Sequence, residues 1–533
     1  MRKRFCTLLL PILLLLLRPL QAEHPKLIVV VIVDQMRADY LERFSAQETG
    51  GLHFFNSRGA NFLNANYEHM PTETCLGHSV LLAGRNPART GIVANEWYDR
   101  ETGRMTYCVE DASSPLIGES GEAVSPKNLL GDNFADWLQS SYPGARIISI
   151  SLKDRAAIVM GGHHPQAVLW FSHETGNFVT SRYYGNQVPV WAQEFNGRHM
   201  VNSYAGQQWA PLPASDSHAD PTKQVGGQFP HLMPKQSGRL LNDAVYGSPF
   251  GDEFLEAFAE HVIKANHLGE NQGSAPDLLA IGFSSNDAVG HTYGPDSPEI
   301  ADEQIRLDRT IGHLMEFLNT RLGADNILWA LSADHGVEPA PEAEQQLRGN
   351  KAARRLSFSA AMQSIQSQLN AIFKIPGEMH WFAGRTDTML YFDRTELARH
   401  NISIAAASEA LAKQVKSVPG IDGFYDVTRL ESVEGWIGPV LRNSVFPKRS
   451  GDVYYLPSQW TLFSSKPTGT SHGDPWPYDR HVPLVLAGWH VKAQRIARNV
   501  QVADLAPTLA DLTGVHWSKS EVLDGKSRKG LLK

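Results

Sequence analysis

The chain has 533 residues, of which 42% are hydrophobic and 20% are charged, and its formal net charge at pH 7 is −7. This composition is typical of a folded globular protein and excludes a disordered chain. The mild excess of acidic residues also argues against a nucleic-acid-binding protein, which depends on basic surfaces. The length allows one large domain with insertions, or two to three domains.

The N-terminus has the pattern of a signal peptide. A basic start at Arg2, Lys3 and Arg4 precedes a short leucine-rich run, and Ala22 offers a small residue for cleavage. The run is short for a membrane span, and a retained N-terminal anchor is the alternative. Removal of residues 1–22 deletes four basic residues and no acidic ones, so the formal charge changes from −7 to −11. We expect a periplasmic or secreted mature protein with no stable membrane insertion.

Four apolar runs predict buried strands. The first, Lys26–Asp34, is rich in β-branched residues, as expected for a strand buried on both faces of a parallel sheet. The others are Arg146–Ile150, Leu278–Ser285 and Asn326–Leu331. A helix pattern at Ile300–Leu322, a returning strand at Val482–Ala487 and a closing helix at Val502–Leu512 complete the alternation. The order predicts an α/β fold with a doubly wound, mostly parallel sheet flanked by helices.

Two long segments fit this alternation less clearly. Residues from about 160 to 275 are rich in Gly, Pro, His and aromatic residues and have weak periodicity. Residues from about 340 to 465 contain a strand candidate at Thr386–Phe392 and an amphipathic helix pattern at Ile402–Val415. We expect both to be insertions in a single domain of residues 23–533, and the second to form a small α+β cap over the active site.

The stretch His69–Gly84 presents Thr74 in a distinctive setting. A Pro and two threonines lead through Gly-His into an apolar run, which predicts a turn that delivers a hydroxyl to the first turn of a helix. Free backbone N–H groups and the helix dipole favour an anion at such a position. A Thr hydroxyl becomes a useful nucleophile when a base or a metal removes its proton. The simpler interpretation is that Thr72 or Thr74 is only an N-cap.

Polar side chains follow the predicted strands at the edge of the sheet where α/β proteins bind ligands. Six of them carry carboxylates or imidazoles, which is enough for two zinc ions with three protein ligands each. They are Asp34, Asp287, His291, Asp334, His335 and His472. Asn95 offers an amide donor, and Lys153 and Arg155 offer two cations for a charged group. Each residue alone has a structural explanation, such as a cap or a solvated turn, but together they predict a reaction site.

Seven segments resemble, in order and spacing, the alkaline phosphatase superfamily. They are VDQMR, PTETCLGH, NEW, SLKDR, NDAVGH, ADHG and SHGDPWPYDRHVP. The likeness spans about Lys26 to Gly514 and is greatest to bacterial periplasmic alkaline phosphatases with a threonine nucleophile. Type I phosphodiesterase/nucleotide pyrophosphatases are close relatives of these enzymes. The resemblance implies a monomeric, zinc-dependent hydrolase of small-molecule phosphate monoesters with two Zn²⁺ per chain.

The same resemblance assigns roles to the predicted site residues. One zinc lies beside the Thr74 alkoxide, which forms a phosphothreonine intermediate, and its other ligands are Asp34, Asp334 and His335. The second zinc is held by Asp287, His291 and His472. Asn95 and the backbone N–H of Thr74 or Cys75 bind phosphoryl oxygens. Lys153 and Arg155 match the cation pair that these phosphatases use against the doubly charged monoester. The donor set also suits Mn or Fe, so the metal identity stays open.

A phosphodiesterase or nucleotide pyrophosphatase with the same two metals is the main alternative. The Lys153–Arg155 pair argues against it, because a monoester has more charge than a diester and fixed cations reward that difference. A sulfatase would need a C/S-x-P-x-R context, which Cys75–Ser79 lacks, and Gly77–Leu81 lacks the second Gly of the serine hydrolase motif. A non-catalytic zinc- or phosphate-binding protein is the alternative from another class.

Two cysteines, Cys75 and Cys108, remain after removal of the signal peptide, which excludes a dense disulfide framework. They can pair in an oxidising compartment, but the sequence leaves this open. Cys75 also departs from the Ala of the resembling enzymes. As a small residue it is expected to pack without consequence.

Overall fold

The computed structural model describes residues 24–212, 229–271 and 275–532, so the expected signal peptide lies outside the described residues. A ten-stranded sheet forms the centre, in the order β18, β2, β19, β11, β1, β10, β5, β6 and β7, with β20 beside β2. Five neighbouring strands run parallel: β11 (Ile327–Ser332), β1 (Leu27–Val33), β10 (Asp277–Phe283), β5 (Ile147–Ser151) and β6 (Ala167–Phe171). This arrangement confirms the predicted mostly parallel α/β sheet.

Antiparallel pairs close the two edges of the sheet. At one edge, β19 (Leu484–Gly488) pairs with β11, and β2 (Ala60–Asn66) pairs with both β19 and β18 (His481–Val482). At the other edge, β7 (Phe178–Val179) pairs with β6. The last strand, β20 (Gln494–Gln501), is parallel to β2.

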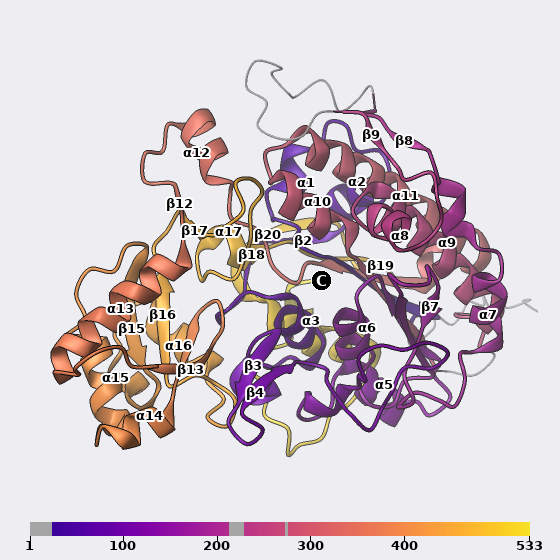
Figure 1. Ribbon diagram of the computed structural model, residues 1–533. Coiled ribbons are helices and arrows are strands. Elements are labelled where there is room, and N and C mark those ends of the chain that lie inside the picture. Colours follow the sequence, from indigo (N-terminus) through magenta and orange to yellow (C-terminus); the bar gives the residue numbers. More distant parts are fainter. Residues whose placement is uncertain (1–23, 213–228, 272–274, 533) are drawn as a thin grey trace, which may run out of the picture.

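Helices cover both faces of the sheet, as Figure 1 shows. One face carries α2 (Gly51–Arg58), α9 (Pro249–Asn266), α10 (Ser285–Tyr293) and α11 (Pro298–Leu322). The other carries α3 (Thr74–Ala83), α5 (Phe134–Ser141), α6 (Asp154–Gly161) and α18 (Leu505–Thr513). The central strands are therefore buried on both faces, which explains their continuous apolar sequences.

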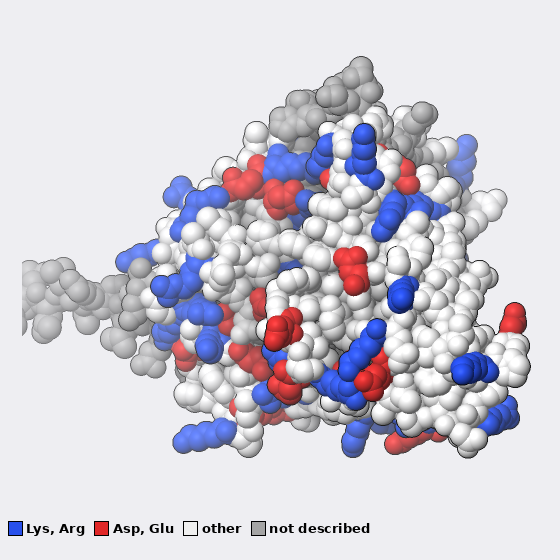
Figure 2. Space-filling model, turned by 90° about the vertical axis from the view of Figure 1, so that its left-hand side faces the viewer, with Lys and Arg blue, Asp and Glu red and all other residues white. Residues whose placement is uncertain are grey.

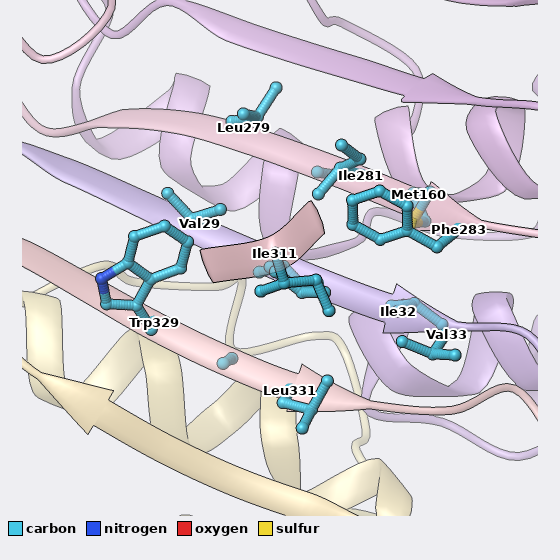
Figure 3. Close-up of a cluster of buried hydrophobic side chains, with 14 of the residues drawn as sticks. Val29, Ile32, Val33, Met160, Leu279, Ile281, Phe283, Ile311, Trp329 and Leu331 are labelled. Atoms are coloured by element: carbon cyan, nitrogen blue, oxygen red, sulfur yellow. The ribbon is translucent and has the colours of Figure 1, made fainter. Parts of the chain in front are cut away.

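Figure 3 shows the core beneath α11. Val29 of β1 lies between Leu279 of β10 and Trp329 of β11, with which it is in register. Ile311 of α11 packs in the same cluster, and all four side chains are almost fully buried. This packing holds the three strands firmly, so that the residues at their carboxyl ends have defined positions.

The structure differs from the sequence pattern at two places in the sheet. The predicted strand Val482–Ala487 is divided into β18 and β19 at Pro483, which has no N–H to donate to a ladder. Residues 160–275 also contribute β6 to the main sheet and α9 to the layer above it. A buried strand of five residues cannot be distinguished by periodicity from an apolar stretch of helix, so the pattern does not reveal β6.

A second sheet lies to the left of the main sheet in Figure 1, coloured orange. Its strands, in order, are β13 (Phe382–Arg385), β14 (Met389–Phe392), β16 (Val453–Pro457) and β15 (Ile421–Asp426). The helices of this segment are α13 (Phe358–Phe373), α14 (Arg394–Arg399), α15 (Ile404–Lys413) and α16 (Ile437–Ser444). The strand expected at Thr386–Phe392 begins at Met389, because residues 386–388 form the turn after β13. That turn reaches the active-site cavity.

Within the parts of the chain that the structure describes, no helix has both the length and the apolar character needed to cross a membrane.

Candidate active site

The carboxyl ends of three central strands bring the predicted metal ligands together. Asp34 follows β1, Asp287 lies in the first turn of α10 after β10, and Asp334 and His335 follow β11. His472 comes from the loop between β17 (Thr461–Phe463) and α17 (Pro477–Arg480). Residues that are up to 438 positions apart in sequence thus meet at one edge of the sheet, as expected for an α/β fold.

Asp287, His291 and His472 form one group that can hold a metal ion. One candidate ligand atom from each lies within 4.8 Å of the other two. Asp287 Oδ1 is 3.4 Å from His291 Nε2 and 3.9 Å from His472 Nε2. Asp287 and His291 are four residues apart on α10, so the helix presents both on one face.

Asp34 and Asp334 belong to a second group of candidate ligands, and His335 adjoins Asp334. His335 Nε2 is 3.3 Å from Asp334 Oδ2, and the His335 ring stacks on the His472 ring at a centroid distance of 3.5 Å. His335 therefore lies between the two groups. The structure also brings His78 within ligand distance of Asp34 and Asp334.

His78 and Gln35 are site residues that the sequence did not reveal. His78 Nε2 is 3.3 Å from Asp34 Oδ1, and the residue lies four positions after Thr74 on α3. That spacing places Thr74 and His78 on one helix face. It is the sequence feature from which His78 could have been predicted. Gln35 donates its backbone N–H to Asp334 Oδ1 at 2.9 Å and its side-chain amide to Asp287 Oδ1 at 2.8 Å. It therefore braces one carboxylate of each group.

Hydrogen bonds to backbone carbonyls orient the three predicted histidine ligands. Nδ1 lies 3.0 Å from the Thr470 carbonyl oxygen in His291 and 2.9 Å from the Gly336 oxygen in His335. In His472 it lies 2.6 Å from the Thr72 oxygen. A carbonyl oxygen can only accept, so Nδ1 is the donor in each ring and Nε2 is left with a free lone pair. Histidine metal ligands are typically fixed in this way.

Several buried ligand atoms lack hydrogen bonds, which is an independent indication of a metal site. Asp334 Oδ2 and His335 Nε2 make no hydrogen bond among the described residues, and Asp34 Oδ1 and Oδ2 have only ion-pair contacts, with His78 and Lys153. Asp34, Asp334 and His335 are fully buried, and buried polar atoms are nearly always satisfied. Oxygen and nitrogen donors at such positions fit a divalent transition metal such as zinc.

Lys153 lies among these carboxylates. Its Nζ is 2.7 Å from Asp287 Oδ2 and 3.0 Å from Asp34 Oδ2. Burial alone would raise the pKa of Asp34, but the Lys153 ammonium and His78 outweigh it and lower this pKa to about 2. Burial likewise opposes ionisation of Asp287, yet Lys153 and His291 bring its pKa well below the ordinary value. Both groups are therefore carboxylates at neutral pH, as metal binding requires.

Thr74 opens α3 and lines a cavity of about 660 Å³. Arg155 lines the same cavity and places its Nη2 3.5 Å from Thr74 Oγ1. Asn95 Oδ1 accepts the Cys75 N–H at 2.9 Å, which leaves the Asn95 Nδ2 amide as a donor. The sequence predicts that the backbone N–H of Thr74 or Cys75 binds phosphoryl oxygens. In this structure the Cys75 N–H donates to Asn95. The structure brings Thr74, Asn95 and Arg155 to one cavity, with Lys153 deeper among the carboxylates.

A disulfide and a close approach at a glycine fix α3 in this position. Cys75 forms a disulfide with Cys108, directly after the hairpin of β3 (Glu96–Asp99) and β4 (Arg104–Tyr107). The Cys108 N–H also donates to the Asn95 carbonyl at 2.8 Å. Gly77 permits the close approach of α3 to the end of β11, because a Cβ there would lie 1.9 Å from the Asp334 carbonyl oxygen. The pairing that the sequence left open is therefore present beside Thr74.

A comparison with protein families shows to which family this chain belongs. Residues 28–478 match the family model of type I phosphodiesterase / nucleotide pyrophosphatase. The chain belongs to this family. Its membership confirms the expected likeness to the alkaline phosphatase superfamily, since relatives named alkaline phosphatases match over most of the chain.

Two such relatives extend over nearly the whole chain. The alkaline phosphatase PhoV of Synechococcus elongatus is 31% identical over 535 aligned positions, which cover 97% of this chain and 94% of PhoV. The alkaline phosphatase PafA of Elizabethkingia meningoseptica is 28% identical over 520 positions, covering 94% and 93%. The crystal structure of wild-type PafA has a TM-score of 0.86 with 27% identity, and covers 96% of this chain and 99% of that chain.

Proposed function

We propose that this protein is an alkaline phosphatase, a zinc-dependent phosphate monoester hydrolase that acts through a phosphothreonine intermediate on Thr74. The observation that carries the proposal is the position of Thr74. Its hydroxyl lies at a helix N-terminus, 3.5 Å from the Arg155 guanidinium, in a cavity that Asp287, His291 and His472 also line. The names of the relatives PhoV and PafA support the same activity.

Two zinc ions would be held by the chain's two sets of buried donors. The first set is Asp34, Asp334 and His335, with the Thr74 hydroxyl, and the second is Asp287, His291 and His472. When bound, such ions lower the pKa of a coordinated hydroxyl or water and stabilise charge on a leaving oxygen. The buried Asp334 Oδ2 and His335 Nε2, which make no hydrogen bond among the described residues, support this assignment.

The residues of the cavity then account for two in-line displacements. Thr74 Oγ1 attacks phosphorus, the bond from phosphorus to the ester oxygen breaks, and the alcohol leaves. Water attacks the phosphothreonine, the bond between Oγ1 and phosphorus breaks, and inorganic phosphate leaves while Thr74 regains its hydroxyl. Asn95 and Arg155 hold the equatorial phosphoryl oxygens, where charge is concentrated in the transition state. The N-terminus of α3 adds a favourable dipole.

Arg155 and Lys153 favour a monoester over a diester. Arg155 offers a guanidinium to the second unesterified charge that only the monoester carries. Lys153 adds positive charge at the carboxylates behind the cavity, 2.7 Å from Asp287. A diester would leave this charge less well matched. The family model that matches the chain is nonetheless named for diesterases, so a phosphodiesterase or nucleotide pyrophosphatase is the second candidate.

The deciding experiment compares kcat/KM for p-nitrophenyl phosphate with that for bis-p-nitrophenyl phosphate, on zinc-loaded mature protein. We expect a strong preference for the monoester, and a preference for the diester would select the second candidate.

Thr74→Ala should abolish turnover, whereas Thr292→Ala, an exposed threonine on α10, should retain it. A monoester that is chiral at phosphorus should react with retention, and inversion would exclude the covalent intermediate.

We further propose that the protein is exported and works as a monomer on small-molecule substrates. The signal-peptide pattern supports export, as does the Cys75–Cys108 disulfide, because disulfides persist in oxidising compartments.

On the face shown in Figure 2, basic and acidic side chains are interspersed, unlike the continuous basic surface that nucleic acids require. N-terminal sequencing of the exported protein tests cleavage after Ala22, and sedimentation velocity tests the monomer.

A further inference from the structure

A second cavity, of about 290 Å³, adjoins the active-site cavity. Four residues line both: Arg385, Asp387, Ser471 and His472. Arg385 is the last residue of β13 and Asp387 lies in the turn before β14, whereas Ser471 and His472 come from the loop that carries this metal-ligand candidate. A substituent on a phosphate bound at Thr74 can therefore extend past Arg385 and Asp387 into the second cavity.

The charged residues that line the second cavity are mostly acidic. Glu338, Asp387 and Asp474 supply three carboxyl groups, and Arg385 is the single Lys or Arg among the lining residues. The Arg385 guanidinium stacks over the Phe358 ring, 4.4 Å from its centroid. Asp387 lies beside the His472 loop, since its Oδ2 is 3.9 Å from the position that a Cβ on Gly473 would occupy. The lining of the second cavity thus has three acids and one guanidinium.

Glu338 gives independent evidence that the second cavity has room for a polar ligand. Its side chain is only 3% exposed, and its Oε1 has no hydrogen-bond partner among the residues that the structure describes. Burial, together with the nearby Asp474 and Asp479, raises the pKa of Glu338 well above the ordinary value. By itself Glu338 therefore favours the protonated form, and a cationic ligand beside it would stabilise the carboxylate.

Two further acids line the active-site cavity. Glu73 and Glu96 line the active-site cavity together with Asp387 and the cations Arg155 and Arg385. Glu73 is buried and accepts the Asn95 N–H, so it is fixed beside Thr74. A leaving group that carries negative charge would meet these acids, whereas a cationic one would be attracted by them.

We propose that the second cavity is a leaving-group subsite, and that its acidic lining makes the enzyme prefer monoesters whose leaving group carries an ammonium group over those that carry a carboxylate. The inference rests on the proposed phosphatase activity and specifies its substrate class. The Thr74 side of the active site binds the phosphoryl group, which all substrates share. Discrimination between substrates arises at Glu338, Asp387 and Asp474.

The test uses three substrates that differ only at the far end of the leaving group: 3-aminopropyl, 3-hydroxypropyl and 3-carboxypropyl phosphate. For the zinc-loaded full-length mature protein, we expect kcat/KM to fall in that order, with the ammonium ester favoured over the carboxylate ester by about tenfold or more, as expected for charges near a protein surface. The preference should shrink as salt is added, because screening weakens charge interactions.

Two variants assign the preference to the second cavity. Asp387→Asn and Glu338→Gln should each reduce the ratio of ammonium to carboxylate ester at least threefold. Comparing this ratio between each variant and the wild type cancels the differences in intrinsic reactivity among the three substrates. Glu431→Gln, which neutralises an exposed acid on the second-sheet segment, should leave the ratio unchanged. Asp387 is exposed to the cavity, so its substitution tests the proposal even if Glu338→Gln fails to fold.

The outcomes separate this inference from the proposed function. Absence of p-nitrophenyl phosphate hydrolysis would refute the phosphatase itself. Hydrolysis with equal kcat/KM for the three alkyl esters, or a ratio that neither variant changes, would refute the leaving-group subsite alone. An ammonium preference that falls in Asp387→Asn and Glu338→Gln but persists in Glu431→Gln would establish the subsite.

Discussion

Arg155 brings a guanidinium within 3.5 Å of the Thr74 hydroxyl, and it is positioned by Tyr107, whose hydroxyl is 3.5 Å from Arg155 Nη1. We expect Arg155→Ala to reduce kcat/KM for p-nitrophenyl phosphate about 100-fold, the usual effect of removing one donor to developing phosphoryl charge. The diester has one charge fewer, so its kcat/KM should fall less than tenfold. Arg182→Ala, at an exposed position, is the control. Equal losses for both substrates would show that Arg155 does not discriminate between them.

We expect the buried carboxyl group of Glu48 to make the folded protein less stable as the pH rises. Its side chain is 2% exposed, neither carboxyl oxygen has a hydrogen-bond partner among the described residues, and burial next to Asp308 raises its pKa to about 9. The folded protein therefore keeps a proton on Glu48 that the unfolded chain releases above about pH 4.5. The contribution of Glu48 to stability is present below that pH and is lost as the pH rises toward 9.

The variant Glu48→Gln should remove this loss. Because Gln stays neutral, the free energy of unfolding of the variant relative to the wild type should increase between pH 5 and pH 9, by up to about 1.4 kcal/mol per pH unit. Urea denaturation at pH 5, 7 and 9 measures the difference. Glu316→Gln, at an exposed position on α11, should show none. If the curves of the wild type and Glu48→Gln run parallel, Glu48 does not hold the proton in the folded state.

At the scale of elements, the Cys75–Cys108 disulfide joins α3 to the β3–β4 hairpin. Closing a loop of this size stabilises a folded protein by about 2–4 kcal/mol. We expect Cys75→Ala/Cys108→Ala to lose that amount in urea denaturation. The variant should also lose activity, because Asn95 is held between the N–H groups of Cys75 and Cys108.

Dithiothreitol provides the control for this prediction. It should lower the unfolding midpoint of the wild type toward that of the double variant, and should leave the double variant unchanged. A wild-type protein whose midpoint and activity do not respond to complete reduction would contradict the role of the disulfide in holding Asn95.

At the scale of the whole molecule, the proposed metal ligands join strands from the centre of the sheet to the loop that carries His472. Removal of zinc by a chelator should therefore lower the Tm of the entire protein, and added zinc should restore it. A free metal concentration 1,000 times Kd contributes about 4 kcal/mol of stability. Asp287→Asn should weaken the response to zinc, whereas Asp511→Asn, an exposed residue of α18, should keep it. Identical melting with and without zinc would contradict the assigned metal sites.

The second sheet contributes to the active site of the whole molecule, because Arg385 of β13 and Asp387 of the turn after it line both cavities. In the proposed function the phosphoryl group binds at the main sheet, and in the proposed subsite the leaving group meets the second sheet. The motifs that resemble alkaline phosphatases lie mainly in the first part of the fold and in the His472 loop. The second-sheet segment, residues from about 340 to 465, matches those motifs least clearly.

The sequence by itself predicted the four central strands β11, β1, β10 and β5 of the main sheet and the donors that follow three of them. Apolar β-branched runs such as Leu27–Val33 are local patterns, and a parallel strand carries its ligand at the carboxyl end, so Asp34, Asp287 and Asp334 could be placed from sequence alone. Tertiary structure alone decided that Cys75 pairs with Cys108 and that Lys153 lies between Asp34 and Asp287. It also decided that Glu338 and Asp387 share a cavity. These contacts depend on the packing of side chains that are distant in sequence, and no local periodicity records which distant residues will meet.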